Sequence, residues 1–333
     1  MSEPSMNYYT SLTIGVFMLM ATIPCFVYYA KIILSILRDR RMRKRPAYRL
    51  MIAIGIADLT PCIAHAITGL YTTFNKEIPI EIGKLLGVIA TPSYVTYTVL
   101  TLILALNRLF QAWDTDVSHL LFKKRRVFYW IGWSLSIWFA FVVLLLSPDA
   151  TISYNLTRYS WRYDESLSLS SMVKKVEMYV EVGSILLSGI CYAVVLILFI
   201  RKQRSVSSAI VGHHLEVRIL VQSVLISVYC TVLNLFWHNS DWLPDSVFSD
   251  VFLNFMWIFN SWVYPIVYFI VQRLVKEATV TRVQSLANTT NGTTSQDGLS
   301  LSQIRVKRSP IERTLGSVPT TCQAHRHKQI FIT

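Results

Sequence analysis

Long apolar blocks alternate with short polar segments over the first 271 residues of the chain. Most blocks hold about 20 or more residues with almost no charge, the length that a helix needs to cross a hydrocarbon core of about 30 Å. A helix also satisfies its own backbone hydrogen bonds inside lipid. The pattern therefore predicts an all-α bundle of seven transmembrane helices, at residues 11–37, 48–74, 85–113, 128–146, 176–200, 217–237 and 251–271.

The polar segments between the blocks alternate in charge. The first, third and fifth are rich in lysine and arginine, as at 38–45 and 123–126, whereas the second, fourth and sixth are acidic or mixed. Basic loops of a membrane protein are retained in the cytosol. The alternation predicts an N-terminus outside the cell and a cytosolic C-terminus.

The composition fits a membrane protein better than two other classes. Charged residues make up 15% of the chain, below the roughly 25% that is usual in soluble domains. The net charge of +13 does not indicate nucleic-acid binding, because the basic residues form short runs between apolar blocks. The first basic residue, Lys31, follows the first apolar block, so this block is expected to be an anchor and not a signal peptide.

The chain becomes polar after the last apolar block. Residues 286–302 are rich in Ser, Thr, Asn and Gly, a composition that cannot bury a core and predicts disorder. The predicted organisation is a membrane domain at 1–272 and a cytosolic tail at 273–333.

Two charged residues within the predicted spans are candidates for function. Asp58 lies about ten residues into the second span, and Arg108 lies near the cytosolic end of the third. Ionisable groups in a bilayer are costly, so each is a candidate for a functional or switch role. The alternatives are a structural polar contact for Asp58 and an arginine that reaches the lipid interface for Arg108.

The seventh span ends with a polar motif. Asn260 is followed by Tyr264, Pro265 and Tyr268. A proline inside a membrane helix frees a carbonyl group and permits a bend. A bend alone would not explain the neighbouring Asn and Tyr residues, which predict a further role.

Together, Asp58, Arg108 and the motif from Asn260 to Tyr268 resemble the landmarks of rhodopsin-like G-protein-coupled receptors, in the correct order and spacing. The sequence departs from that pattern, since Asn107 replaces the acid before the arginine and Tyr264 replaces the asparagine before the proline. The segment 272–277 resembles the start of the short amphipathic helix that follows the seventh span in these receptors.

The divergent pattern is similar to the nematode serpentine chemoreceptors. The segments Pro46–Met51 and Leu106–Arg108 are typical of them, with the class (t, v or x) left open. The resemblance implies a chemosensory receptor of the plasma membrane that binds an extracellular small molecule or peptide and activates a heterotrimeric G protein, and it leaves a sensory cilium open as the location. It implies no enzyme activity and no cofactor, and it leaves a dimer open.

The resemblance also implies roles for individual residues. Asp58, Asn107, Arg108, Asn260, Tyr264, Pro265 and Tyr268 become the candidate switch residues. In related receptors the acid of the second span helps to bind sodium, and here Asp58 and Asn260 are two candidate ligands. Tyr97 occupies the position that usually offers a serine, which weakens this hypothesis.

Other chemistry is less well supported. A transporter or channel is the alternative function, but Asp58 has no evident charged partner at its depth; an escort protein without a ligand is a third hypothesis. The histidines show no paired His/Glu set at metal-ligand spacing within the spans, so a zinc-dependent membrane hydrolase is not expected. None of the five cysteines lies in a predicted outer segment, so no extracellular disulfide is expected.

The Asn155-Leu156-Thr157 sequon lies in an outer loop and predicts glycosylation at Asn155.

Overall fold

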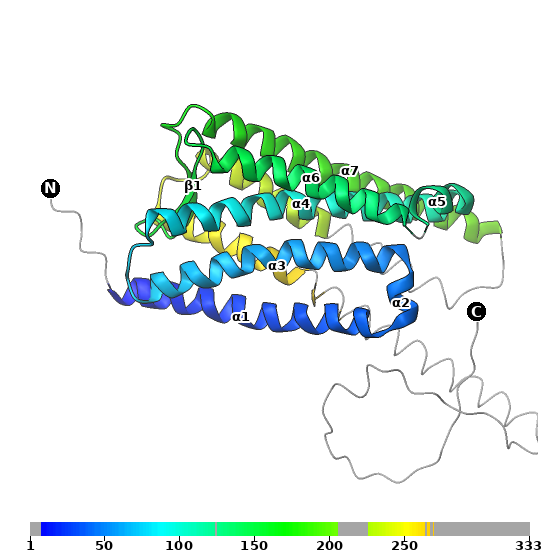
Figure 1. The fold of residues 1–333 in the computed structure, drawn as a ribbon, viewed down its shortest axis with the longest axis horizontal. Coiled ribbons are helices and arrows are strands. Elements are labelled where there is room, and N and C mark those ends of the chain that lie inside the picture. Colours follow the sequence, from blue (N-terminus) through cyan, green and yellow to red (C-terminus); the bar gives the residue numbers. More distant parts are fainter. Residues whose placement is uncertain (1–7, 124, 206–225, 264, 267–268, 270–333) are drawn as a thin grey trace, which may run out of the picture. The chain divides into compact units, whose positions relative to one another are not determined.

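The computed structural model describes residues 8–123, 125–205, 226–263, 265–266 and 269, all within the first of two compact units, Met1–Val271. By length and composition, five of its helices could cross a membrane. They are α1 (Tyr8–Arg38), α3 (Pro46–Thr73), α4 (Ile80–Trp113), α6 (Arg126–Leu146) and α7 (Ser170–Ser205) (Figure 1). Two more helical segments, 226–238 and 247–263, lie where the sixth and seventh spans are predicted.

The helices extend beyond the apolar blocks. α4 begins at Ile80 and α7 at Ser170, whereas the apolar pattern placed these starts at residues 85 and 176. Hydropathy marks the part of a helix that suits lipid, and the hydrogen-bonded helix continues into the polar interface. Two short helices, α2 (Arg40–Lys44) and α5 (Thr115–Phe122), occupy the basic loops.

α4 is the central helix of this unit. It packs against α3, α6 and α7, while α1 packs against α3 (Figure 1). In α4, 83% of the most apolar window is buried, compared with 22% to 44% in the other four long helices. The polar side chains of α4 therefore face other helices and not lipid.

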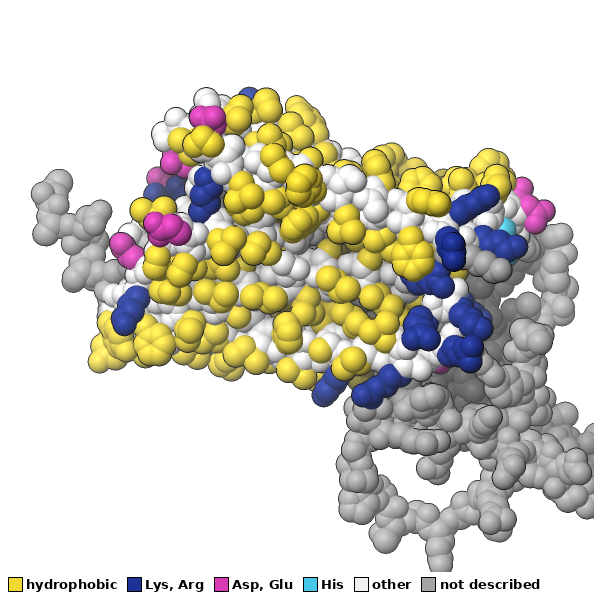
Figure 2. Space-filling model, viewed as in Figure 1, with side chains coloured by type: hydrophobic (Ala, Val, Ile, Leu, Met, Phe, Trp, Pro, Cys, Tyr) yellow, Lys and Arg dark blue, Asp and Glu magenta, His cyan; other side chains and the backbone are white. Residues whose placement is uncertain are grey.

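The sides of the bundle are apolar and its ends are charged. On the face shown in Figure 2, Lys and Arg gather at the end that carries α2 and α5, and a cluster of Asp and Glu lies at the opposite end. Large apolar side chains such as Phe17, Met20 and Phe139 are exposed between the two ends. Such a surface is stable against lipid tails. We call the two ends the basic end and the hairpin end.

A β-hairpin that the sequence pattern did not predict closes the hairpin end. β1 (Ile152–Asn155) pairs with antiparallel β2 (Ser160–Tyr163). Ile152 is opposite Tyr163 and Tyr154 is opposite Trp161, and all four side chains are buried. The alternation of apolar and polar residues in both segments is typical of strands with one buried face, so a signal was present in the sequence.

The turn of the hairpin is attached to the start of α1. Tyr159 and Asn75 have positive φ angles, 55° and 50°, which are uncommon for residues other than glycine. The Tyr159 hydroxyl lies 2.8 Å from Ser11 Oγ, and Ser11 Oγ donates to Asn75 Oδ1 at 2.9 Å. One buried hydroxyl of α1 thus stabilises both turns.

The hairpin also requires a glycine in α4. A Cβ atom at Gly87 would lie 2.4 Å from the carbonyl oxygen of Ile152. We expect Gly87→Ala to displace β1 and to destabilise the protein by about 1–3 kcal/mol, the usual cost of overpacking. Thermal unfolding of the purified protein in detergent measures this. Gly132→Ala is the matched control, because no atom lies within 4 Å of its added Cβ; equal melting temperatures for both variants would contradict the close contact.

Candidate functional site

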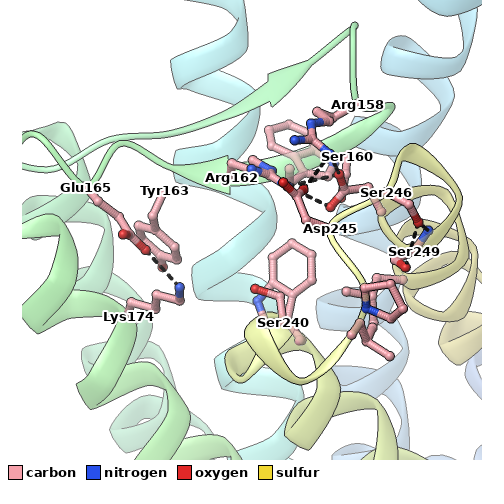
Figure 3. Close-up of a pocket in the computed structure, with 16 residues that line it drawn as sticks. Arg158, Ser160, Arg162, Tyr163, Glu165, Lys174, Ser240, Asp245, Ser246 and Ser249 are labelled. Carbon is pink, nitrogen blue, oxygen red and sulfur yellow. Dashed lines mark hydrogen bonds and ion pairs between the residues drawn. The ribbon is translucent and has the colours of Figure 1, made fainter.

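A cavity of about 670 Å³ opens at the hairpin end. Its walls come from β2, the start of α7 and the loop between the last two helical segments (Figure 3). Charged and hydroxyl groups mix with aromatic rings, including Trp161, Tyr163 and Trp237. Its volume is within the range of about 300–1,000 Å³ that is usual for ligand-binding sites, but its lining is more polar and charged than such sites usually have.

Ion pairs connect the hairpin to the last helical segment across this cavity. Arg162 Nη2 lies 2.9 Å from both carboxylate oxygens of Asp250, and Arg158 Nη1 lies 2.8 Å from Asp245. Arg158 also reaches Asp250 at 3.4 Å. The hydrogen bond with Asp245 raises the pKa of Arg158 above its ordinary value. Asp250 is largely buried, so these pairs hold the hairpin in place.

Tyr163 separates the cavity from a deeper polar cluster. Its side chain lines the cavity, and its hydroxyl donates to the carboxylate of Glu177 on α7. Burial and the negative charge of Glu177 raise the pKa of Tyr163 well above its ordinary value, so the hydroxyl remains a donor. Nearer the surface, Lys174 pairs with Glu165 at 3.0 Å.

The prediction that the spans hold no His/Glu set at metal-ligand spacing is wrong. Glu177, Glu181 and His238 are buried, and one ligand atom from each lies within 4.8 Å of the others. The sequence held part of this signal, since two glutamates four residues apart in an apolar block share one helix face. The approach of His238 from the segment 226–238 depends on tertiary packing.

An aromatic layer lies next to the cavity. The ring of Trp257 is 5.0 Å from those of His65 and Trp237, and 6.5 Å from that of Trp161. The indole N–H groups of Trp161 and Trp257 have no hydrogen-bond partner among the described residues. The two ring nitrogens of His65 also have none there. Sequence analysis singled out none of these residues as a functional site.

Asp58 is fully buried in the middle of the bundle, as its position in the second span predicts. Tyr29 of α1 donates to Asp58 Oδ2, and Ser261 Oγ donates to Asp58 Oδ1 at 2.9 Å. The carboxylate therefore joins α1, α3 and the segment 247–263.

The two candidate sodium ligands have different hydrogen-bond partners. Asn260 is buried, and its Oδ1 accepts from Cys230 Sγ at 3.2 Å. Asp58 is bound by hydroxyl groups, and Tyr97 stacks on Tyr94 with ring centroids 5.6 Å apart. Sodium binding stays a prediction.

The switch residues at the basic end are only partly described. Arg108 is exposed, and its Nη1 donates to Gln111 Oε1 at 3.5 Å. Asn107 is fully buried, and neither of its amide atoms has a hydrogen-bond partner among the described residues. Pro265 is helical and buried, whereas Tyr264 and Tyr268 lie outside the described residues.

The described cysteines and the sequon have clear positions. Cys25, Cys62, Cys191 and Cys230 are buried and free, and Cys322 lies outside the described residues. Asn155 is exposed at the end of β1, and its Oδ1 accepts from the Thr157 hydroxyl at 2.6 Å. Glycosylation at Asn155 stays a prediction that this exposed turn would permit.

Comparison with known proteins identifies the family. A family model described as "Serpentine type 7TM GPCR chemoreceptor Srt" matches residues 2–291. The chain belongs to this family. The match resolves the class that the sequence motifs left open. No curated protein matches the sequence.

Solved structures identify the fold. The crystal structure of squid rhodopsin superposes with a TM-score of 0.62 at 14% identity, over 90% of this chain and 95% of that chain. At this identity the likeness shows the fold alone, and it confirms the prediction of a seven-transmembrane helix bundle. The Srt protein is therefore a multi-pass membrane receptor of the G-protein-coupled type.

The ion pairs predict a role for Asp250 in holding the hairpin. Asp250→Asn should leave Arg162 without its carboxylate partner, so amides of residues 152–163 should exchange about tenfold faster, equivalent to ~1.4 kcal/mol of local stability. Hydrogen–deuterium exchange of the purified Srt protein measures this. Glu165→Gln is the control, because an exposed pair contributes little. Unchanged exchange in Asp250→Asn would show that these pairs do not hold the hairpin.

The exposed turn at the end of β1 predicts modification at Asn155. The protein expressed in animal cells should lose mass on treatment with an N-glycosidase. Asn155→Gln should remove this loss, and Asn288→Gln, which alters a sequon in the predicted cytosolic tail, should not. A mass loss that persists in Asn155→Gln would place the glycan elsewhere.

Proposed function

We propose that this Srt protein is a chemosensory receptor of the plasma membrane, placed on a sensory cilium, that binds an extracellular small molecule or peptide and activates a heterotrimeric G protein. One observation carries the proposal. The cavity opens at the hairpin end, whereas Arg108 is exposed at the basic end, so a ligand site and a signalling surface occupy opposite ends of one bundle. Family membership supports the receptor class.

The cavity suits a polar ligand with an aromatic or apolar part. Arg158, Arg162 and Lys174 offer positive charge, Asp245 and Glu165 offer negative charge, and aromatic rings lie among them. Binding energy gained here must differ between two states of the bundle, because a ligand shifts an equilibrium only by its differential affinity.

Packed residues connect the cavity to the middle of the bundle. Trp237 lines the cavity and contacts Trp257 with ring centroids 5.0 Å apart. One helical turn further along, Ser261 donates to Asp58. A ligand that moves Trp237 would thereby change the packing around Asp58, which supports Asp58 and Asn260 as switch residues.

The basic end supplies the candidate contact with the G protein. Asn107 stands at the position of the acid, and within the part of the chain that the structure describes Arg108 donates a hydrogen bond to Gln111 and not to a buried acid. The guanidinium group is thus exposed for a partner that enters between the helix ends. The amide atoms of buried Asn107 have no hydrogen-bond partner among the described residues, and a second state of the bundle that supplied one would be stabilised by it.

We expect Arg108→Ala to weaken signalling. In cells that carry a calcium or cyclic-nucleotide reporter and a panel of volatile and water-soluble attractants, the potency of an active compound should fall by about 5- to 150-fold, the range of a typical coupling free energy. Tyr268→Ala should do the same. Lys123→Ala is the control, because it removes an exposed charge at the same end.

Two outcomes would contradict the proposal. A full response in Arg108→Ala and Tyr268→Ala would remove these residues from the switch. Solute flux through the protein that persists without any G protein would favour the alternative of a transporter or channel.

A further inference from the structure

The deepest unexplained feature is a pair of buried carboxylates below the hairpin. Glu177 and Glu181 lie one turn apart on α7 and are 2% and 0% exposed. Within the described residues, the one ion pair that either of them makes is between Glu181 Oε2 and His238 Nε2, at 3.1 Å. A buried charge without a partner is strongly destabilising. A protonated His238 can compensate one carboxylate and leaves the other uncompensated.

Two atoms of the cluster have no partner. Glu181 Oε1 and His238 Nδ1 are buried and make no hydrogen bond with the described residues. A proton shared by the two carboxyl groups would remove the second charge. A cation bound between the three side chains would compensate both carboxylates, and it would bind His238 through the ring nitrogen that faces Glu181.

The donor set fits a transition metal. We propose that Glu177, Glu181 and His238 form a binding site for a divalent transition metal, with Zn²⁺ as the ion that fits best. Imidazole nitrogen and carboxylate oxygen are common zinc ligands, and a tetrahedral site places its ligand atoms about 3.3 Å apart. The three ligand atoms already lie within 4.8 Å of one another, so rotation of the side chains closes the site.

Tyr163 supplies the outer side of this site. Its hydroxyl donates to Glu177, and its ring lines the cavity (Figure 3). It can orient the carboxylate from the second coordination sphere. An organic ammonium ion fits less well, because the three side chains are closed over by the protein.

The metal would join three parts of the receptor. Glu177 and Glu181 belong to α7, His238 belongs to the segment 226–238, and Tyr163 belongs to the hairpin. A bound ion would restrain the outer ends of two helices and the wall of the cavity together. A cavity ligand that favours this arrangement would bind more tightly when the metal is bound. By linkage, the metal would bind more tightly when the ligand is bound.

The test is metal binding by the full chain in lipid nanodiscs, after treatment with a chelator. Equilibrium dialysis with Zn²⁺ should give one ion per chain. Glu181→Gln and His238→Ala should weaken binding at least tenfold, the lower end of the loss seen when even an outer-sphere partner of a metal is removed. Glu181→His should retain binding, because it replaces one ligand by another, and Glu165→Gln should match the wild type.

A second measurement does not depend on the folding of a variant. X-ray absorption of the Zn²⁺-loaded wild type should show nitrogen and oxygen ligands, whereas thiolate sulfur would mean that cysteines bind the ion and would overturn the proposal. Absence of Zn²⁺ binding by the wild type, or binding that Glu181→Gln leaves intact, would also overturn it. So would an organic amine that binds through Glu181 while Zn²⁺ does not. None of these measurements involves a G protein, so this site and the receptor proposal can fail separately.

Discussion

The rest of this structure depends on one constraint, which is that lipid offers no hydrogen-bond partners to polar groups. Water cannot reach the middle of the bundle, so polar side chains must find partners inside the protein. Asp58 is bound by hydroxyl groups from two other helices, and Asn234 Nδ2 donates to the Tyr94 hydroxyl at 3.1 Å. These contacts select which helix faces turn inward. α4 occupies the centre, where its Ser93 also accepts a hydrogen bond from Trp138 of α6.

The same constraint separates the two ends of the bundle. Apolar side chains cover the middle, so charges concentrate where the chain leaves lipid. At the hairpin end the charges pair across a cavity, as Arg162 does with Asp250. At the basic end they remain exposed, as Arg108 does. A receptor needs this division, because its ligand and its intracellular partner approach from opposite sides.

Among the residues that the structure describes, several buried polar atoms without a hydrogen-bond partner lie near the proposed ligand side. His65, Trp161 and Trp257 carry nitrogen atoms of this kind, and so do Glu181 and His238 through one atom each. An unpaired buried group costs about 1–3 kcal/mol. A bound ligand or ion that supplies the missing partner recovers this energy. Unpaired polar atoms near the cavity therefore favour binding there.

The sequence by itself determined the membrane class, the order and orientation of the spans and the burial of Asp58, because hydropathy and loop charge act over each segment separately. Tertiary structure alone decided where the hairpin packs, the partners of Asp58 and the meeting of Glu177 and Glu181 with His238. Those contacts join residues far apart in the chain, such as Glu181 and His238, and no local pattern specifies which helix faces meet. The glutamate spacing on α7 was visible in the sequence, but its third member became evident only when the helices were packed together.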